Sequence, residues 1–263
     1  MDRRRAGVDA GRRTGVLPHL ALALCLILTA CSSGSATRFV SPDTVALAGV
    51  RMDRLRETPI YRKLERENRL PRFGEFSSRD IHEVLLTSDG KNVLAIARGA
   101  DLNGTVYKGF TLYGNSAAVR AAIDQSKSGG RGPRDLLARA EALPADAQIW
   151  AVVEGWRGAT PDQLRALGNL ANLDRVLRLV EGASLTVDLR TGAHAVFAGD
   201  ARTEADAKSL ADSLRGLASL ARMGVQRKPD LLRALDGIQV KQDGRVVQVN
   251  FDIAEDLAEK LVR

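Results

Sequence analysis

The sequence of 263 residues has few aromatic side chains, three histidines and only two cysteines. Aromatic residues make up 4% of the chain. This scarcity argues against sugar hydrolysis and against binding of single-stranded nucleic acid, which depends on exposed rings that stack on the bases. The remaining composition, with 44% hydrophobic residues, 27% charged residues, 24 glycines and 8 prolines, is that of a globular protein. A collagen-like or wholly disordered chain is therefore excluded.

Long apolar runs and catalytic motifs are also missing. The apolar segment Leu20–Ala30 is shorter than the roughly 20 residues of a spanning helix, which excludes a polytopic membrane protein. No Gly-x-Ser-x-Gly nucleophile motif occurs. The glycine-rich residues 129–132 lack the preceding strand and the following Lys-Ser/Thr pair of a phosphate-binding loop. We therefore predict no catalytic residue and no cofactor.

What the chain does have is a clear export segment at its start. Residues 1–30 contain five arginines, then an apolar core, then small residues, as in a secretory signal. The junction Leu28-Thr-Ala-Cys31, followed by Ser32-Ser-Gly-Ser, resembles the lipobox of bacterial lipoproteins. The resemblance implies cleavage between Ala30 and Cys31 and lipidation of Cys31 with three acyl chains, of which two suffice for a stable membrane anchor.

The same resemblance predicts an address in the cell envelope. The protein would face the periplasm or the exterior, and Ser32, where an aspartate tends to signal inner-membrane retention, favours the outer membrane if the cell has one. A plain secretory signal with an accidental cysteine, or a short uncleaved anchor, is the alternative. With Cys25 removed and Cys31 lipidated, the body would hold no cysteine, which excludes disulfides, thiolate zinc sites and cysteine nucleophiles.

The body divides by composition into a tether, two predicted lobes and a linker. Residues 31–41 are a flexible tether that spans roughly 17 Å. Residues 42–126 form a first lobe, the glycine-rich residues 127–134 a linker, and residues 135–263 a second lobe. Both lobes alternate strand-like and helix-like patterns, with hairpins predicted at Asp89-Gly90 and Asp243-Gly244. Without residues 1–30, which hold five of the basic and two of the acidic residues, the net charge is only about +4.

These patterns predict an α+β fold of two small lobes, each an antiparallel sheet with helices on one face. The second lobe matches the β-α-β-β-α-β order of ferredoxin-like folds, and residues 94–99 and 194–199 occupy the same place in each lobe, so we predict a degenerate repeat. The segments Val45–Pro59 and Tyr107–Tyr113 also loosely resemble a group of uncharacterised two-lobed exported proteins of soil bacteria. Relative to that group the first lobe is shortened near Ala100–Gly104. The resemblance implies no activity.

Two histidines and two tryptophans of the body are the candidate functional side chains. His82 and His194 are either a base or metal pair from equivalent places in two repeats, or unrelated residues of separate sheets. Without cysteine or a His-x-x-x-His spacing, the second interpretation is favoured and no metal is predicted. Trp150 and Trp156 are either an anchor for a partner protein or core and cover residues. Arginines of the first helix either face lipid headgroups or belong to a solvated face of mixed charge.

The sequence therefore predicts a membrane-anchored envelope lipoprotein that acts as a non-catalytic binding or scaffolding module. Its partner would be another envelope protein, bound through a sheet face or a strand edge. The alternative is a hydrolase or a small-ligand-binding protein with a cleft between the lobes, where His82 or His194 would titrate. Neither hypothesis includes nucleic acid.

Overall fold

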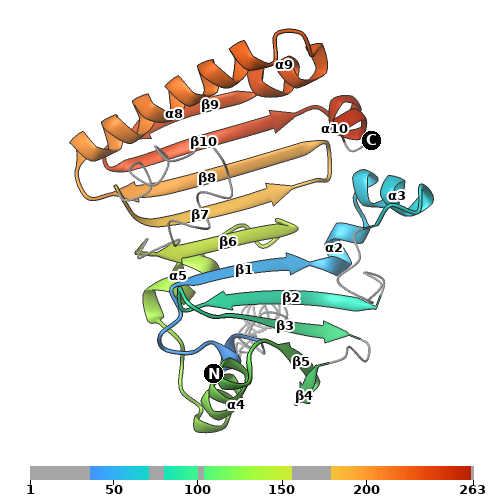
Figure 1. The fold of residues 1–263 in the computed structure, drawn as a ribbon, viewed down its shortest axis with the longest axis vertical. Coiled ribbons are helices and arrows are strands. Elements are labelled where there is room, and N and C mark those ends of the chain that lie inside the picture. The colour runs from blue at the N-terminus through green and yellow to red at the C-terminus, as the bar shows by residue number, and fades with distance from the viewer. Residues whose placement is uncertain (1–35, 71–79, 100–103, 156–178, 262–263) are drawn as a thin grey trace, which may run out of the picture. The chain divides into compact units, whose positions relative to one another are not determined.

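The described residues form one ten-stranded antiparallel sheet with helices packed on it (Figure 1). A computed structural model describes residues 36–70, 80–99, 104–155 and 179–261. The strand order is β4-β5-β3-β2-β1-β6-β7-β8-β10-β9. The strands are β1 (Ala46–Arg51), β2 (Ile81–Ser88), β3 (Val93–Gly99), β4 (Thr105–Tyr107), β5 (Phe110–Tyr113), β6 (Ile149–Glu154), β7 (Val180–Asp188), β8 (Ala193–Ala201), β9 (Ile238–Asp243) and β10 (Val246–Ile253).

Seven α-helices and one 3₁₀ turn lie among the described residues. The helices are α2 (Met52–Arg56), α3 (Pro59–Arg66), α4 (Ser116–Ser128), α5 (Arg134–Glu141), α8 (Glu204–Gly224), α9 (Pro229–Asp236) and α10 (Glu255–Leu261), and the 3₁₀ turn η1 is Thr37–Phe39. The α+β class and the antiparallel sheet predicted from the sequence are therefore confirmed.

The sheet has two halves with the same strand order, joined at its centre. Counting outward from the centre, the first half runs β1-β2-β3-β5-β4 and the second half runs β6-β7-β8-β10-β9. The central strands β1 and β6 pair over five positions, from Ala46 opposite Val153 to Val50 opposite Ile149. The sheet is therefore continuous from one half to the other.

This continuity differs from the two lobes and ferredoxin-like repeats expected from the sequence, which the structure does not show. Strands β6 and β7 are direct antiparallel neighbours, whereas a ferredoxin-like unit inserts another strand between the two that flank its first helix. Helix α3 of the first half also contacts α10 of the second, where the Lys63 ammonium lies 3.1 Å from Glu259 Oε2. Of the predicted linker, Lys127 and Ser128 end α4 and Arg134 begins α5.

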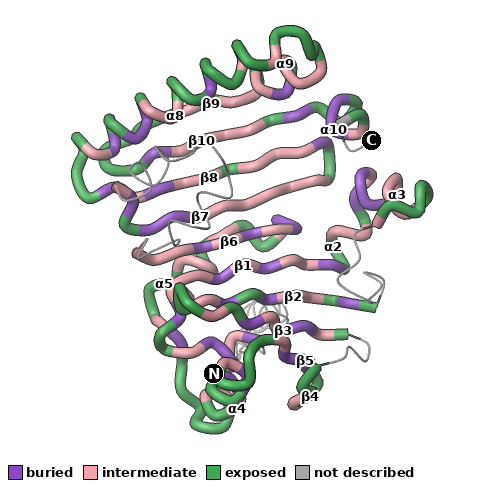
Figure 2. Tube along the Cα trace, viewed as in Figure 1, coloured by how far each residue is buried: buried purple, intermediate pink, exposed green. Residues whose placement is uncertain are grey.

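Helices cover both faces of the first half, rather than one face as predicted, because α2 and α3 pack beside Val50 and Val84 on the face opposite α4 and α5. Trp150 and Val152 of β6 belong to the core under η1, α4 and α5 in the first half. Val153, the next residue, packs with the core under α8 in the second half. Because side chains alternate between the faces of a strand, the two cores lie on opposite sides of the sheet. Helix α8 alternates buried and exposed residues along its length, as expected for such a cover (Figure 2).

Local sequence explains where several elements begin and break. Helices α2 and α3 are separate, because Thr58 caps α3 by accepting a hydrogen bond from the Tyr61 amide and Pro59 stands at the first turn of α3. Strands β4 and β5 form a hairpin, since Lys108 and Gly109 between them both have positive φ, at 48° and 80°. Thr203 caps α8 as its sequence predicts, accepting from the Asp206 amide at 3.0 Å.

The residues behind the export prediction lie outside the described residues. These are Ala30, Cys31 and the tether up to Ser35. Within the described ranges, no helix combines the length and the hydropathy needed to cross a bilayer. Cleavage and lipidation at Cys31 stay predictions.

Candidate functional site

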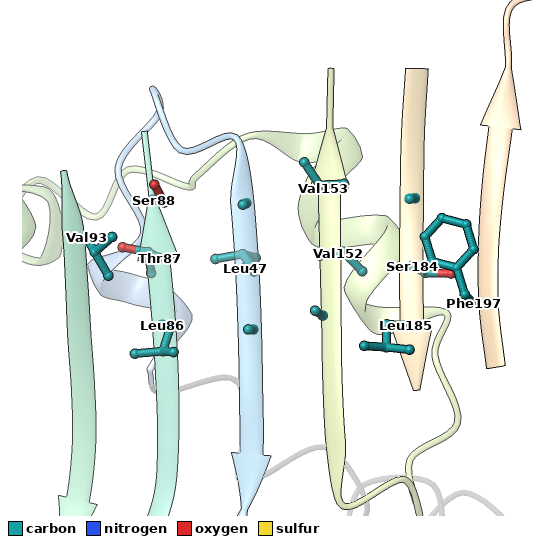
Figure 3. A pocket seen from close by; sticks show the side chains of 14 residues that line it. Leu47, Leu86, Thr87, Ser88, Val93, Val152, Val153, Ser184, Leu185 and Phe197 are labelled. Atoms are coloured by element: carbon teal, nitrogen blue, oxygen red, sulfur yellow. The ribbon is translucent and has the colours of Figure 1, made fainter. Parts of the chain in front are cut away.

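An apolar groove lies where the two halves of the sheet meet (Figure 3). Its volume is about 370 Å³, within the range of small-ligand pockets. Fourteen residues line it, contributed by β1, β2, β3, β6, β7 and β8. The first three of these strands belong to the first half of the sheet and the last three to the second.

The side chains that face the groove follow from strand register. One cross-strand row is Leu86, Ala48, Ala151, Leu185 and Phe197, and the next contains Ser88, Ala46, Val153 and Ala183. Alanines on β1 and β6 form a low floor, and larger side chains on the outer strands form walls. Val93 and Leu86 on one wall are 60% and 39% exposed, so the groove is open to solvent.

The groove has almost no polar chemistry. Among the residues on this face only Ser88 carries a polar side chain, and its hydroxyl already accepts a hydrogen bond from the Gly90 amide at 3.1 Å. Thr87 alternates to the opposite face and borders a separate pocket beside α4. No lining residue is charged or a histidine. The groove therefore suits an apolar ligand and lacks a general acid, base or metal ligand.

The groove exists because β1 and β6 are apolar on both faces. Leu47 and Val152 face the core under α4 and α5, whereas their neighbours Ala48 and Val153 face the other side. Strands with such continuous apolar runs are usually covered on both faces. Among the described residues α8 covers this second face as far as β7 and β6, and α2 and α3 cover it beside Val50 and Val84, which leaves the part over Ala46 and Ala48 open.

The two histidines are not brought together. Strands β1, β6 and β7 separate His82 on β2 from His194 on β8, which places the two strands about 19 Å apart. His82 Nδ1 lies 2.9 Å from Asp53 Oδ1, which also accepts from Arg56. The interpretation as a joint base or metal pair is thus wrong, and the described residues contain no cluster of three or more metal-ligating side chains.

His194 has the neighbours of a catalytic triad but not its hydrogen bonding. Its Nδ1 lies 2.9 Å from Asp252 Oδ1, and its Nε2 lies 3.3 Å from the Thr191 hydroxyl and 3.1 Å from the Thr191 carbonyl oxygen. A carbonyl oxygen only accepts, so Nε2 carries a proton and does not act as a base toward the hydroxyl. The hydrogen bond to Asp252 raises the pKa of His194 above its usual value.

The other candidate side chains have mainly structural contacts. Trp150 is 7% exposed and belongs to the core of the first half, while Trp156 lies outside the described residues. Arg51 donates to the Ala147 carbonyl and lies over the Trp150 ring. Arg56 pairs with Asp53, so some of the arginines predicted to face lipid have protein partners instead.

Comparison with solved structures finds similarity at low sequence identity. No family model matches the chain, and no curated protein matches it. A solved structure titled "Structure of crystal form I of TP0453" is similar, with a TM-score of 0.46 and 8% sequence identity. The similarity covers 86% of this chain and 94% of that chain.

Proposed function

We propose that this chain is a lipid-anchored protein of the bacterial envelope that binds an apolar ligand in the groove between the halves of its sheet. The observation that carries the proposal is the groove itself, about 370 Å³ of open apolar space across the β1–β6 junction. It corresponds to the cleft of the small-ligand hypothesis, although the cleft lies within one sheet. The lipobox-like Leu28–Cys31 supports the anchor.

The chemistry of the groove favours binding without catalysis. Its lining offers no nucleophile with an adjacent base, which hydrolysis requires. His194 is three residues from Phe197 along β8 and therefore faces the opposite side of the sheet. We accordingly propose that the protein is not an enzyme and needs no cofactor.

Dye binding tests the groove in the full chain. 1-Anilinonaphthalene-8-sulfonate fluoresces in apolar sites, and we expect saturable binding that weakens at least tenfold in Val93→Asp. Val106→Asp is the matched control, because Val106 is 61% exposed on β4 and lies outside the groove, against 60% for Val93. Equal loss in both variants, or in neither, would contradict the proposal.

Fractionation tests the anchor. We expect the wild-type chain to sediment with membranes and Cys31→Ser to move to the soluble fraction, because the variant lacks the acceptor for the lipid. Retention of Cys31→Ser in membranes would reject the lipoprotein part of the proposal and leave the groove unaffected.

A partner protein is the second candidate, favoured by an exposed apolar stripe on α8. Leu217, Leu220 and Met223 are 36%, 60% and 58% exposed and follow helical spacing. In-cell crosslinking of the full chain, with Leu220→Asp as the variant, tests this stripe. A recurrent protein partner that Leu220→Asp loses and Val93→Asp keeps would favour scaffolding over ligand binding.

A further inference from the structure

A second pocket lies beside α4, on the face of the sheet opposite the groove. Its volume is about 210 Å³, and its lining comes from η1 and the loop after it, from β2, β3 and the turn between them, and from the first half of α4. Thr87 of β2 pairs with Leu47 of β1, which belongs to the core under α4, so the side chain of Thr87 faces this pocket. The sheet therefore separates the pocket from the groove, and binding in one does not require the other.

Two threonine hydroxyls of this pocket are buried and lack hydrogen-bond partners among the described residues. Thr44 is 5% exposed and Thr87 is 6% exposed, and both line the pocket. The hydrogen bonds that these two residues make with other described residues all come from their backbones. Because buried polar groups in native proteins normally have partners, the two hydroxyls indicate a site that a polar ligand group completes.

Two carboxylates give the pocket an excess of hydrogen-bond acceptors. Asp89 is held in place, since its Oδ1 accepts from the Lys91 and Asn92 amides at 2.8 and 2.6 Å and its Oδ2 accepts from the Asn92 side chain at 2.9 Å. The Asp43 carboxylate has no ion pair and no hydrogen bond with another described residue, although it lines the same pocket. No lysine or arginine is part of this lining. A cation that donates hydrogen bonds therefore suits the pocket.

The rest of the lining favours an organic cation over a metal ion. Six of the twelve lining residues are apolar, namely Phe39, Leu94, Ala117, Ala118, Ala121 and Ala122. Calcium takes about six to eight oxygen ligands, and the part of the chain that the structure describes holds no group of three or more metal-ligating side chains. The volume is also below the roughly 300–1,000 Å³ of pockets for drug-sized ligands, so the cation is small.

The free acceptors distinguish between kinds of ammonium group. A quaternary ammonium has no N–H and is usually bound by a cage of exposed aromatic rings, whereas Phe39, the one aromatic residue of this lining, is fully buried. A primary ammonium carries three donors, as the lysine side chain does. These donors match the Asp43 carboxylate and the hydroxyls of Thr44 and Thr87.

We infer that the pocket beside α4 binds the primary ammonium group of a small amine. The ammonium donates to Asp43, Thr44 and Thr87, and the alkyl part lies against the alanines of α4. The amine is either a free alkylamine or the ethanolamine head group of a lipid, which share this chemistry. This site goes beyond the proposed function, because it uses none of the side chains that face the groove.

NMR titration of the ¹⁵N-labelled full chain carrying Cys31→Ser tests the inference, with n-butylamine as the probe. The amine is protonated at pH 7, as lysine is, and n-butanol is the neutral control with the same alkyl chain. We expect saturable shifts of the Asn92 and Ala118 amide signals with n-butylamine, and binding of n-butanol that is at least tenfold weaker. Equal binding of the two compounds would overturn the inference.

Three variants locate the binding. Asp43→Asn removes the free carboxylate and is expected to weaken n-butylamine binding at least tenfold, while Thr87→Val removes one hydroxyl and is expected to weaken it about threefold or more. Asp124→Asn is the matched control, because Asp124 is an exposed carboxylate of α4 outside the lining, and it should bind as the parent does. Circular dichroism checks each fold, and the exposed Asp43 keeps the test decisive if Thr87→Val does not fold.

The remaining outcomes separate this site from other ligands and from the groove. No saturable binding would mean that water alone fills the pocket, and shifts with calcium ions but not with n-butylamine would make it a metal site, so either result overturns the inference. Displacement of n-butylamine by phosphatidylethanolamine vesicles, but not by phosphatidylcholine vesicles, supports the lipid head group, and bound n-butylamine that neither displaces supports a free amine. Val93→Asp should bind n-butylamine as the parent does, so failure of the groove proposal leaves this site unaffected.

Discussion

At the scale of single residues, Gly49 and Trp150 are the tightest pairing in the centre of the sheet. They are register partners on β1 and β6, and the indole lies directly over the glycine. A Cβ at position 49 would overlap the ring, which is held in the core and lies under Arg51. We expect Gly49→Ala to lower the free energy of unfolding by about 1–3 kcal/mol, as overpacking does. Denaturant titration measures this change.

Gly216 in α8 is the matched control for that substitution. An added Cβ there meets no heavy atom within 4 Å, and alanine favours a helix interior by about 0.5–1 kcal/mol over glycine. Gly216→Ala should therefore stabilise the protein. If Gly49→Ala left the free energy of unfolding as high as Gly216→Ala does, the close packing of Trp150 against Gly49 would be contradicted.

His194 should titrate above its usual range because of Asp252. A raised folded pKa means that protonation stabilises the fold, so this contribution is complete below the unfolded pKa of about 6.5 and is lost as the pH rises through the folded value. We expect NMR titration to give a His194 pKa above 6.5, and Asp252→Asn to lower it.

Asp243→Asn controls for the simple loss of one negative charge. Asp243 lies at the far end of β9, away from His194, so its substitution should leave the His194 titration unchanged. An unaltered His194 pKa in Asp252→Asn would show that the hydrogen bond at 2.9 Å does not set it.

At the scale of elements, Arg139 connects α5 to strands of the second half. Its guanidinium lies 2.5 Å from Glu154 Oε1 on β6 and 2.5 Å from Asp200 Oδ2 on β8. Gly182 stands between these two residues in the register, and a Cβ there would collide with the guanidinium. The arginine thus crosses β7 over a glycine. The first half's covering helix is thereby tied to the second half of the sheet.

Removing this bridge should destabilise the protein moderately. We expect Arg139→Met to lower the free energy of unfolding by about 1–2 kcal/mol, because two carboxylates lose a charged hydrogen-bond donor in a half-buried site. Lys127→Met is the control, since the exposed Lys127–Asp124 pair contributes less than about 0.5 kcal/mol. Equal effects in thermal or urea unfolding would mean that Arg139 is only a surface pair.

Elements were predictable where local chemistry decides them. Asp89 Oδ1 accepts from the amides of Lys91 and Asn92, so the Asp-Gly turn formed as expected. The helix start at Thr58-Pro59 and the turn at Lys108-Gly109 also follow from local chemistry, a helix cap and a tight turn. Which faces the helices cover was not predictable, because β1 and β6 are apolar on both faces.

At the scale of the whole molecule, the candidate site was predictable only in part. The alternative hypothesis from the sequence placed a ligand cleft between two lobes, whereas the groove lies on one continuous sheet at the β1–β6 junction. The residues that line the groove could not be named from the sequence. They share one face only because β1 pairs with β6, about a hundred residues further along the chain. No motif marks alanines and valines brought together by register. His82 and His194, the titratable groups that the sequence offered as candidates, lie outside the groove.

The same β1–β6 pairing predicts that the two halves unfold together. Besides this ladder, the halves are joined by Lys63 of α3, which contacts Glu259 of α10, and by the bridge of Arg139. We expect urea unfolding of Trp156→Phe to give one transition, with the same midpoint by Trp150 fluorescence and by circular dichroism, since coincident probes indicate a cooperative unit. Trp150 lies on β6 at the β1–β6 junction, so its fluorescence reports unfolding at this junction. Independent lobes would give two midpoints. Because residues of both halves line the groove, two midpoints would also mean that the groove is lost before the protein is fully unfolded.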